Sequence, residues 1–187
     1  SHSILVMKIN LLLSCCLGIV NILSAQQTDT RNWPVQTDSA YHFTFKRPPG
    51  WELKLPGTNT RFFLTSQKEN EQDPFRENVN CMARVIEQAG FKISDAADAI
   101  KKSLSEKLQD FKLLKSAYST WNNSETLVLE YTCTQEADGN TYNIHLLQRM
   151  AVVKNTLFTF TYTAEETSYN KFISIVNKVF QSLKIKQ

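Results

Sequence analysis

Alternating apolar and polar side chains mark several strands along the chain. Near the start, Tyr41, Phe43 and Phe45 face one way while polar residues between them face the other. The alternation returns in residues 79–86 and is clearest in residues 157–163, where aromatic residues alternate with threonines. Because successive side chains of a strand point to opposite faces, this period of two predicts strands that each bury one face.

The longest run of such strands predicts an antiparallel meander over residues 124–163. Its strands at residues 126–134 and 141–153 are separated by Asp-Gly-Asn at residues 138–140, a turn sequence because these residues accept positive φ angles. Asn155 supplies the next turn.

The stretch of residues 62–87 predicts two further strands with a polar loop between them. Residues 62–65 form a short apolar run typical of a strand buried on both faces. Residues 67–73 contain no apolar side chain, so we expect a solvated loop. The second strand then places Val79 and Cys81 on its core side.

Two segments show the period of an amphipathic helix instead. One begins near Ser94, a good N-cap with Asp95 in the first turn, and the other spans residues 169–185. Each carries one apolar stripe, so we expect each helix to bury one face. The stripes consist of Ala97, Ile100, Leu104, Leu108 and Phe111 in the first helix and of Phe172, Val176, Val179, Phe180 and Leu183 in the second.

These elements predict a single α+β domain. It contains a mainly antiparallel sheet of about six to seven strands, flanked by two main helices. Long runs of strands without intervening helices argue against a doubly wound parallel sheet.

The first 25 residues have the pattern of a secretory signal peptide behind a short upstream extension that ends before Met7. Lys8 supplies the positive charge, residues 11–23 the apolar stretch, and Ser24 and Ala25 the small-residue exit. We expect cleavage near Ala25 and therefore a periplasmic or secreted protein.

Two alternatives to a cleaved signal remain open. A retained membrane helix is less favoured, because the apolar stretch is short for a membrane span. A lipoprotein is also less favoured, because the lipobox-like residues 13–15 leave little apolar length after Lys8.

The chain therefore divides into three parts: residues 1–25, a polar lead-in over residues 26–39, and a folded domain over residues 40–187. We expect the lead-in to be flexible, although Trp33 offers a way to attach it to the surface of the domain.

The charge balance excludes a nucleic-acid-binding class. Lysine and arginine number 21 against 18 acidic residues, a formal net charge of +3, and no stretch combines basic residues with interleaved aromatic ones.

The chain carries no recognisable catalytic or metal-binding motif after the signal. Its two histidines there, His42 and His145, lie on predicted strands without a paired ligand at zinc spacing. Neither a nucleophile turn nor a glycine-rich phosphate loop occurs. We predict no catalytic residue, no metal site and no cofactor; a pocket holding His145 beside an acidic residue and a hydroxyl would revive a hydrolase.

Carboxylates gather around the polar loop. Glu69, Glu71, Asp73 and Glu77 lie close in sequence, and calcium takes oxygen ligands from such runs. Their spacing matches no calcium loop, so we expect a solvated loop rather than an ion site.

Two cysteines, Cys81 and Cys133, remain after the signal. An oxidising compartment permits a disulfide between them. Both share strand faces with apolar residues, so buried free thiols are the favoured alternative.

A short motif resembles the PsbP-like family of exported domains. Residues 73–80 read Asp-Pro-Phe-Arg-Glu-Asn-Val-Asn, and they follow Phe-Phe-Leu-Thr-Ser at residues 62–66 and Pro-Gly-Trp at residues 49–51. The similarity spans residues 41–185 and implies an α/β/α sandwich. In that family these residues belong to turns and strand starts, so the resemblance implies no active-site residue. Cys81 departs from the family pattern, which has an aliphatic residue there.

The resemblance and the missing motifs favour an exported, non-enzymatic accessory or protein-binding module of the cell envelope. Its partner would be another envelope protein, with no nucleic acid involved and membrane contact only through the signal segment or the partner. The alternative is a binder of a lipid or other small apolar molecule, with a pocket between sheet and helix formed by Trp51, Phe62, Phe75 or Tyr131.

Overall fold

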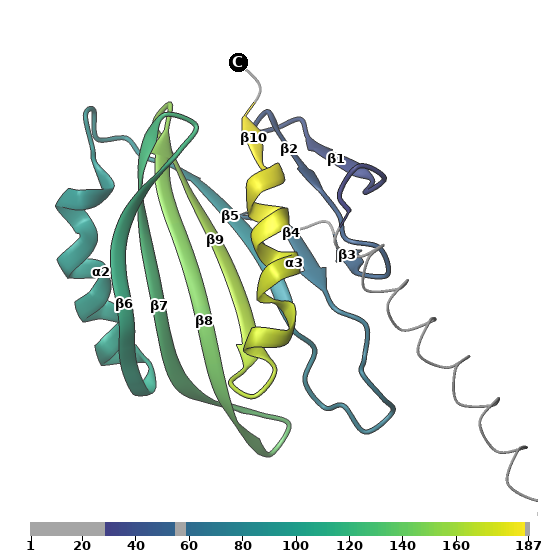
Figure 1. Cartoon of the computed structure of the whole chain (residues 1–187). Coiled ribbons are helices and arrows are strands. Elements are labelled where there is room, and N and C mark those ends of the chain that lie inside the picture. Colours follow the sequence, from purple (N-terminus) through teal and green to yellow (C-terminus); the bar gives the residue numbers. More distant parts are fainter. Residues whose placement is uncertain (1–28, 55–58, 186–187) are drawn as a thin grey trace, which may run out of the picture.

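A seven-stranded antiparallel sheet forms the centre of the computed structural model, which describes residues 29–54 and 59–185 (Figure 1). The predicted signal peptide, residues 1–25, lies outside these ranges. In spatial order the main sheet consists of β3 (Glu52–Lys54), β4 (Thr60–Thr65), β5 (Asn78–Val85), β9 (Thr156–Glu165), β8 (Asn140–Val153), β7 (Ser124–Ala137) and β6 (Gln109–Trp121).

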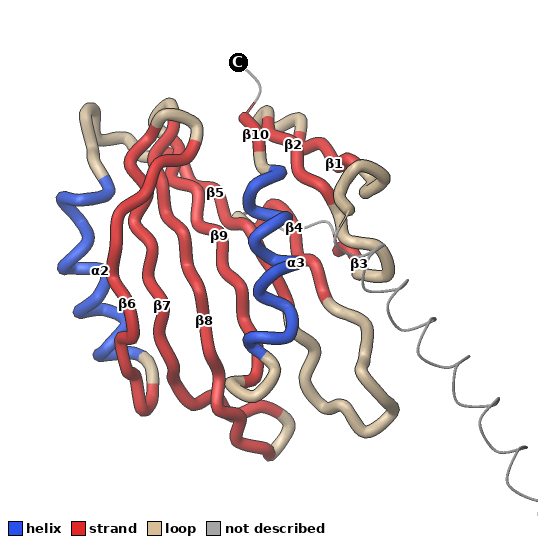
Figure 2. Tube along the Cα trace, viewed as in Figure 1, coloured by secondary structure: helices blue, strands red, loops and turns tan. Residues whose placement is uncertain are grey.

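A second, three-stranded sheet lies beside one end of the main sheet, and the described residues form two helices (Figure 2). The α+β class and the predicted number of main-sheet strands are confirmed. In the described part, neither helix has the length and apolar character needed to cross a membrane. The remaining elements are β1 (Val35–Asp38), β2 (Phe43–Lys46) and β10 (Lys184–Ile185) of the small sheet, and the helices α2 (Ile93–Lys107) and α3 (Tyr169–Ser182).

Strands β6, β7, β8 and β9 follow one another as hairpins, so the predicted meander begins one strand earlier than residue 124. Each hairpin turns through two residues with positive φ, which is the turn geometry that matches the twist of paired strands. The turn residues are Asn122 and Asn123, Asp138 and Gly139, and Lys154 and Asn155.

The two helices pack on opposite faces of the main sheet. Leu129 on β7 pairs in register with Gln148 on β8, which pairs with Thr161 on β9, so these three side chains share a face. Leu129 packs in the cluster that contains α2 residues, whereas Phe160, the neighbour of Thr161, packs in the cluster that contains α3 residues. Helix α2 contacts β6, β7 and β8, and α3 contacts β9 and β2. Each helix therefore covers only one half of its face.

The small sheet completes the cover beside α3. Phe43 and Phe45 on β2 are buried, and their rings pack on Phe62 of β4 at centroid distances of 6.2 and 4.0 Å. Phe43 also meets Phe158 of β9 edge to face at 5.9 Å. These aromatic contacts join the small sheet to the main one.

Part of the predicted flexible lead-in, residues 26–39, is ordered on the domain. Strand β1 pairs with β2 over all four of its residues, and Trp33 is only 3% exposed. The expected flexibility is therefore wrong for residues 29–39, and the alternative, attachment to the domain through Trp33, is correct. Burial of the indole stabilises this otherwise polar segment on the domain.

The first helix differs from its prediction at both ends. Lys92, not Ser94, occupies the N-cap position, and the helix ends at Lys107. Phe111 lies in β6, yet it packs in the same apolar cluster as Leu104 and Leu108. The apolar residues Leu108 and Phe111 fit the helical spacing although they lie beyond the helix, because the chain after α2 packs against the same apolar cluster.

The contact between the two sheets predicts a large effect for Phe43→Ala. Phe43 is fully buried between aromatic rings, so its removal leaves a cavity and should lower the free energy of unfolding by about 3 to 5 kcal/mol in urea denaturation. Val35→Ala is the matched control in the same small sheet, because Val35 is 60% exposed and should change stability by less than about 0.5 kcal/mol. Equal effects of the two substitutions would contradict this packing.

Candidate functional site

The two histidines lie in different surroundings. His42 is exposed in the turn before β2, with a φ of 53°, so its predicted strand position is wrong. His145 lies on β8 as predicted. Its imidazole lies within hydrogen-bond distance of a carboxylate.

His145 forms a polar cluster with Glu130 of β7 and Tyr169 of α3. Its Nε2 lies 2.9 Å from Glu130 Oε1, and its ring stacks on the Tyr169 ring at a centroid distance of 3.5 Å. Burial and the neighbouring Glu130 raise the pKa of Tyr169. The Tyr162 hydroxyl of β9 donates to the Tyr169 carbonyl at 3.0 Å. The cluster therefore ties the first turn of α3 to three strands.

This cluster has the groups of a proton relay without an open site for a substrate. The side chains of His145 and Glu130 are 13% and 26% exposed, and none of the three hollows described below is lined by His145, Glu130 or Tyr169. Burial also raises the pKa of the Tyr169 hydroxyl, so this group stays protonated and is a poor nucleophile. The arrangement serves attachment of the helix better than hydrolysis.

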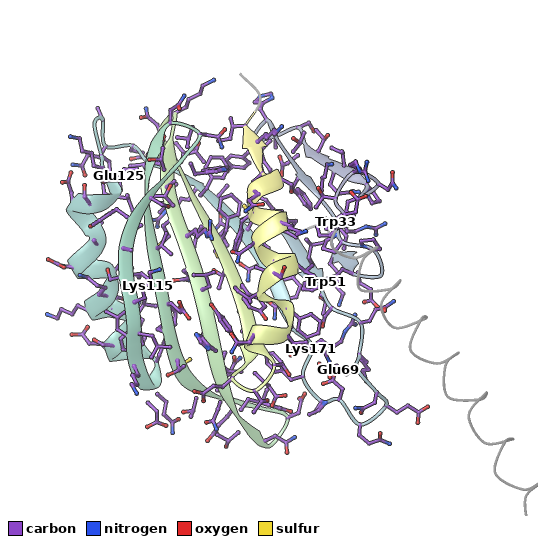
Figure 3. All side chains as sticks on the ribbon, viewed as in Figure 1. Trp33, Trp51, Glu69, Lys115, Glu125 and Lys171 are labelled. Carbon is purple, nitrogen blue, oxygen red and sulfur yellow. The ribbon has the colours of Figure 1, made fainter. Side chains whose placement is uncertain are left out.

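The predicted polar loop is held by pairwise contacts. Lys171 of α3 pairs with Glu69, as Figure 3 shows, and the Asp73 carboxylate accepts hydrogen bonds from the backbone of Glu69 and Phe75 at 2.9 and 3.2 Å. In residues 29–54 and 59–185, no group of three or more acidic, histidine or cysteine side chains is arranged to hold a metal ion.

Glu77 departs from the solvated loop. Its side chain is 1% exposed, and it accepts a hydrogen bond from the Ser66 hydroxyl at 3.2 Å. Burial raises the pKa of this carboxyl. The adjacent Arg76 donates to the Ser66 carbonyl at 2.7 Å and to Glu52 at 3.0 Å. The Arg-Glu pair of the family motif thus fixes the loop to the strands on either side.

The other family motif, Pro-Gly-Trp at residues 49–51, is also structural. Gly50 has a φ of 76°, which glycine adopts at no steric cost, and the Trp51 amide closes the turn onto the Pro48 carbonyl at 3.2 Å. Trp51 is 4% exposed and meets Phe172 of α3 edge to face at 6.0 Å.

The cysteines do not meet. Both Cys81 and Cys133 are buried free thiols. Cys81 lies on β5 and Cys133 on β7, with β9 and β8 between them, so the usual strand spacing alone separates them by at least about 14 Å. A disulfide needs Cα atoms within about 7 Å, so this fold leaves no bridge between them.

The aromatic residues expected around an apolar pocket belong to the core instead. Trp51, Phe62 and Tyr131 are at most 4% exposed, and Phe75 packs on Tyr142 at 5.5 Å. None of the four lines the hollows described here.

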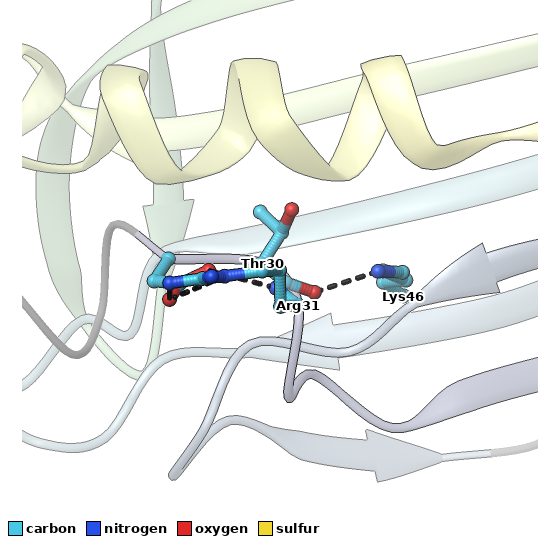
Figure 4. A network of polar contacts seen from close by, with 4 residues as sticks. Thr30, Arg31 and Lys46 are labelled. Carbon is cyan, nitrogen blue, oxygen red and sulfur yellow. Dashed lines mark hydrogen bonds and ion pairs between the residues drawn. The ribbon is translucent and has the colours of Figure 1, made fainter.

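One hollow is an open groove of about 420 Å³ between α3, β2 and the segment before β1. Three lysines line it, Lys46, Lys178 and Lys184. Lys46 donates to the Thr30 carbonyl at 2.7 Å, and in the same segment Arg31 pairs with Asp29 at 2.8 Å (Figure 4). Hydrogen bonds from Arg31 lower the pKa of Asp29 to about 2.

A second hollow, of about 300 Å³, lies at the start of α2 beside Phe91 and Val152. A third, of about 160 Å³, lies between the last turns of α3 and strands β6 to β9. Arg149 of β8 lines this third hollow, and pattern analysis of the sequence does not single it out. The signal that could have identified Arg149 is its spacing: it lies two residues after Leu147 on β8, so both side chains point to the α3 face of the sheet.

The outer strand β6 is the other unusual surface. Ten of its thirteen residues are exposed and none is buried. Three of them are apolar: Leu113, Leu114 and Tyr118 are 39%, 45% and 52% exposed.

Comparison with known proteins supports the fold. A family model described as PsbP matches residues 34–185. Among curated proteins none matches the sequence. Three solved structures superpose over most of the chain, at identities that show the fold alone.

The first is cyanobacterial PsbP (CyanoP) from Synechocystis, with 16% identity, a TM-score of 0.60 and coverage of 82% of this chain and 92% of that one. The second is PA94 of Pseudomonas aeruginosa, a putative regulator of unknown function, with 12% identity, a TM-score of 0.60 and coverage of 83% and 98%. The third is LpqN, involved in cell envelope biogenesis of Mycobacterium tuberculosis, with 11% identity, a TM-score of 0.59 and coverage of 89% and 97%.

The buried carboxyl of Glu77 predicts a pH-dependent stability. Its pKa in the folded state lies above its ordinary value of 4.5. The stability that the protonated carboxyl contributes is therefore fully present below pH 4.5 and is lost as the pH rises through the folded-state pKa. We expect the change in the free energy of unfolding caused by Glu77→Gln, measured in urea, to be more stabilising at pH 7 than at pH 4. Glu71→Gln, on the exposed loop, should behave alike at both values; a Glu77→Gln effect that is the same at pH 4 and pH 7 would contradict the prediction.

The separated cysteines predict two free thiols in the protein lacking residues 1–25. A thiol reagent should modify both in denaturant, and Cys81 should react only on unfolding, because it is fully buried and burial raises its thiol pKa well above 9.0. A chain purified from an oxidising compartment with no free thiol would overturn this result.

Proposed function

Because this chain belongs to the PsbP family, we propose that it is an exported accessory domain of the cell envelope that binds another protein and catalyses no reaction. The observation that carries the proposal is the exposed edge strand β6 with its three outward apolar side chains.

Export is supported by the sequence pattern of residues 1–25, which has the charge, apolar stretch and small-residue exit of a signal peptide. A related fold occurs in LpqN, a protein involved in cell envelope biogenesis. An envelope location suits a domain that works through its surface.

Strand β6 has the geometry to accept a strand from a partner. It pairs with β7 on one side and is the last strand of the main sheet on the other, so its outer backbone groups face outward. Register shifts occur only near its start, between Gln109 and Lys112 and between Leu113 and Lys115. From Lys115 to Trp121 the pairing is regular, which leaves seven residues without a register shift for addition of a strand.

The side chains of β6 indicate the chemistry of the partner segment. Tyr118 pairs in register with Leu127, so it lies on the α2 face, where it can cover apolar side chains of an added strand. Lys112 and Lys115 are exposed on the same strand. Because lysines on an edge strand discourage pairing with another copy of a basic edge, the favoured partner is an extended segment that carries acidic residues.

The absence of enzymatic chemistry is supported by the polar contacts. The groups most suited to proton transfer, His145 and Glu130, face each other, and Tyr169 covers the imidazole. No hollow described here brings a nucleophile to this pair.

Site-directed photo-cross-linking tests the proposed surface. A photoreactive phenylalanine in place of Tyr118 should give one discrete adduct in intact cells, because the partner strand lies against this position. Lys115→Glu in the same chain should lower the adduct yield by about tenfold, since it removes an attraction to an acidic segment and adds a repulsion.

Val85 is the matched control for this experiment. It is apolar and 63% exposed, but it lies on β5, an inner strand that pairs with β9 as far as Val85 and with β4 as far as Met82. Adducts of equal yield at Val85 and Tyr118, or none at Tyr118, would contradict binding at β6.

A further inference from the structure

Arg149 is a partly buried cation without an anion beside it among the described residues. Its guanidinium lies over the Phe180 ring at 4.7 Å, and its Nη2 donates to Asn177 Oδ1 at 3.1 Å. Its Nε is buried and has no acceptor. Within residues 29–54 and 59–185, Arg149 forms no ion pair; Glu130, on the same face of β7, is paired with His145 instead.

Placing the Arg149 guanidinium partly out of water without a counter-charge lowers the stability of the fold. Moving a guanidinium out of water is unfavourable unless a counter-charge and full hydrogen bonding compensate for it. The contacts with Phe180 and Asn177 offset only part of this cost, and burial lowers the pKa of Arg149. Among the described residues Arg149 reaches a neutral acceptor, the side-chain amide oxygen of Asn177, but no carboxylate that would balance its charge.

Arg149 also lines a hollow. The hollow has a volume of about 160 Å³ and lies between the end of α3 and strands β6 to β9. Its polar groups besides Arg149 are hydroxyls and an amide, among them Ser119, Thr126 and Gln181. Its apolar side is formed by the aromatic rings of Trp121, Phe160 and Phe180, with Ala151 and Leu183.

We propose that this hollow is a binding site for a small apolar monocarboxylic acid, with the ligand carboxylate on Arg149 and its apolar body against the three aromatic rings. This inference does not rest on the protein-binding role proposed for β6.

The composition of the hollow selects this class of ligand. One guanidinium neutralises one negative charge, so a monoanion fits better than a phosphate that carries two. A cavity of about 150 Å³ holds a benzene-sized group, so the ligand body is close to that of benzoate. The hydroxyl of Ser119 adds a donor for the second carboxylate oxygen.

Calorimetric titration and NMR shift mapping with benzoate on the full chain test the site. We expect shifts at Trp121 and at the residues around Arg149, and about tenfold weaker binding of benzyl alcohol, which has the same ring without the charge. Octanoate distinguishes a fatty-acid site from a small-acid site: we expect it to bind more weakly than benzoate, because the hollow is too small for its chain.

Four variants test whether the binding is specific to this hollow. Arg149→Met keeps the length of the side chain and should weaken benzoate binding by about tenfold or more, while Arg149→Lys should retain part of it. Ser119→Phe should block the hollow without touching Arg149, and it keeps the test valid if Arg149→Met does not fold. Arg84→Met, on an exposed part of β5, should bind as the unaltered chain does.

Clear outcomes would overturn the proposal. These are no benzoate shifts at millimolar concentration, equal binding of benzoate and benzyl alcohol, octanoate binding tighter than benzoate, or benzoate binding that is unchanged in Arg149→Met and in Ser119→Phe.

Discussion

The structure depends on the aromatic layer that β9 presents to α3. Phe158, Phe160 and Tyr162 are at most 3% exposed, and each joins a different part of the molecule. Phe158 meets the small sheet through Phe43, Phe160 meets α3 through Phe180, and Tyr162 donates to the first residue of α3. Burying each of these side chains stabilises the fold by about 2 to 3 kcal/mol, so one strand fixes the positions of a helix and a sheet.

The packing of α3 and the small sheet on β9 leaves part of each face of the main sheet uncovered. Helix α3 and the small sheet cover the β9 side of one face, and α2 covers the β6 to β8 side of the other. The uncovered part beside β5 carries polar side chains such as Asn80 and Thr159. Beside β6, the hollow lined by Arg149 lies at the end of α3 on one face, and Tyr118 is exposed at the edge of the sheet. The surfaces proposed for binding lie where the cover of the sheet ends.

Local patterns predicted the elements but not the contacts between distant parts of the chain. The alternation of Phe158, Phe160 and Tyr162 and the stripe of α3 were readable, because one face of each is buried. The small sheet was missed, because β1 and β10 have four and two residues, too few for a period. The pairing of His145 with Glu130 and the burial of Arg149 depend on strand register between neighbours, which no local spacing encodes. For the same reason the sequence left the Cys81 to Cys133 bridge open.

Strand β6 links the two surfaces physically. Ser119 and Trp121 form a wall of the hollow, and Tyr118, directly before Ser119, faces the other side of the sheet at the edge proposed for the partner. A strand added to β6 would restrict the motion of Ser119 and Trp121, and a ligand bound in the hollow would restrict the motion of the same two residues. Two binding events that order one segment favour each other, and the coupling is reciprocal in free energy. The Trp121 indole, which donates to the Leu183 carbonyl at 3.2 Å, carries the same constraint to the end of α3.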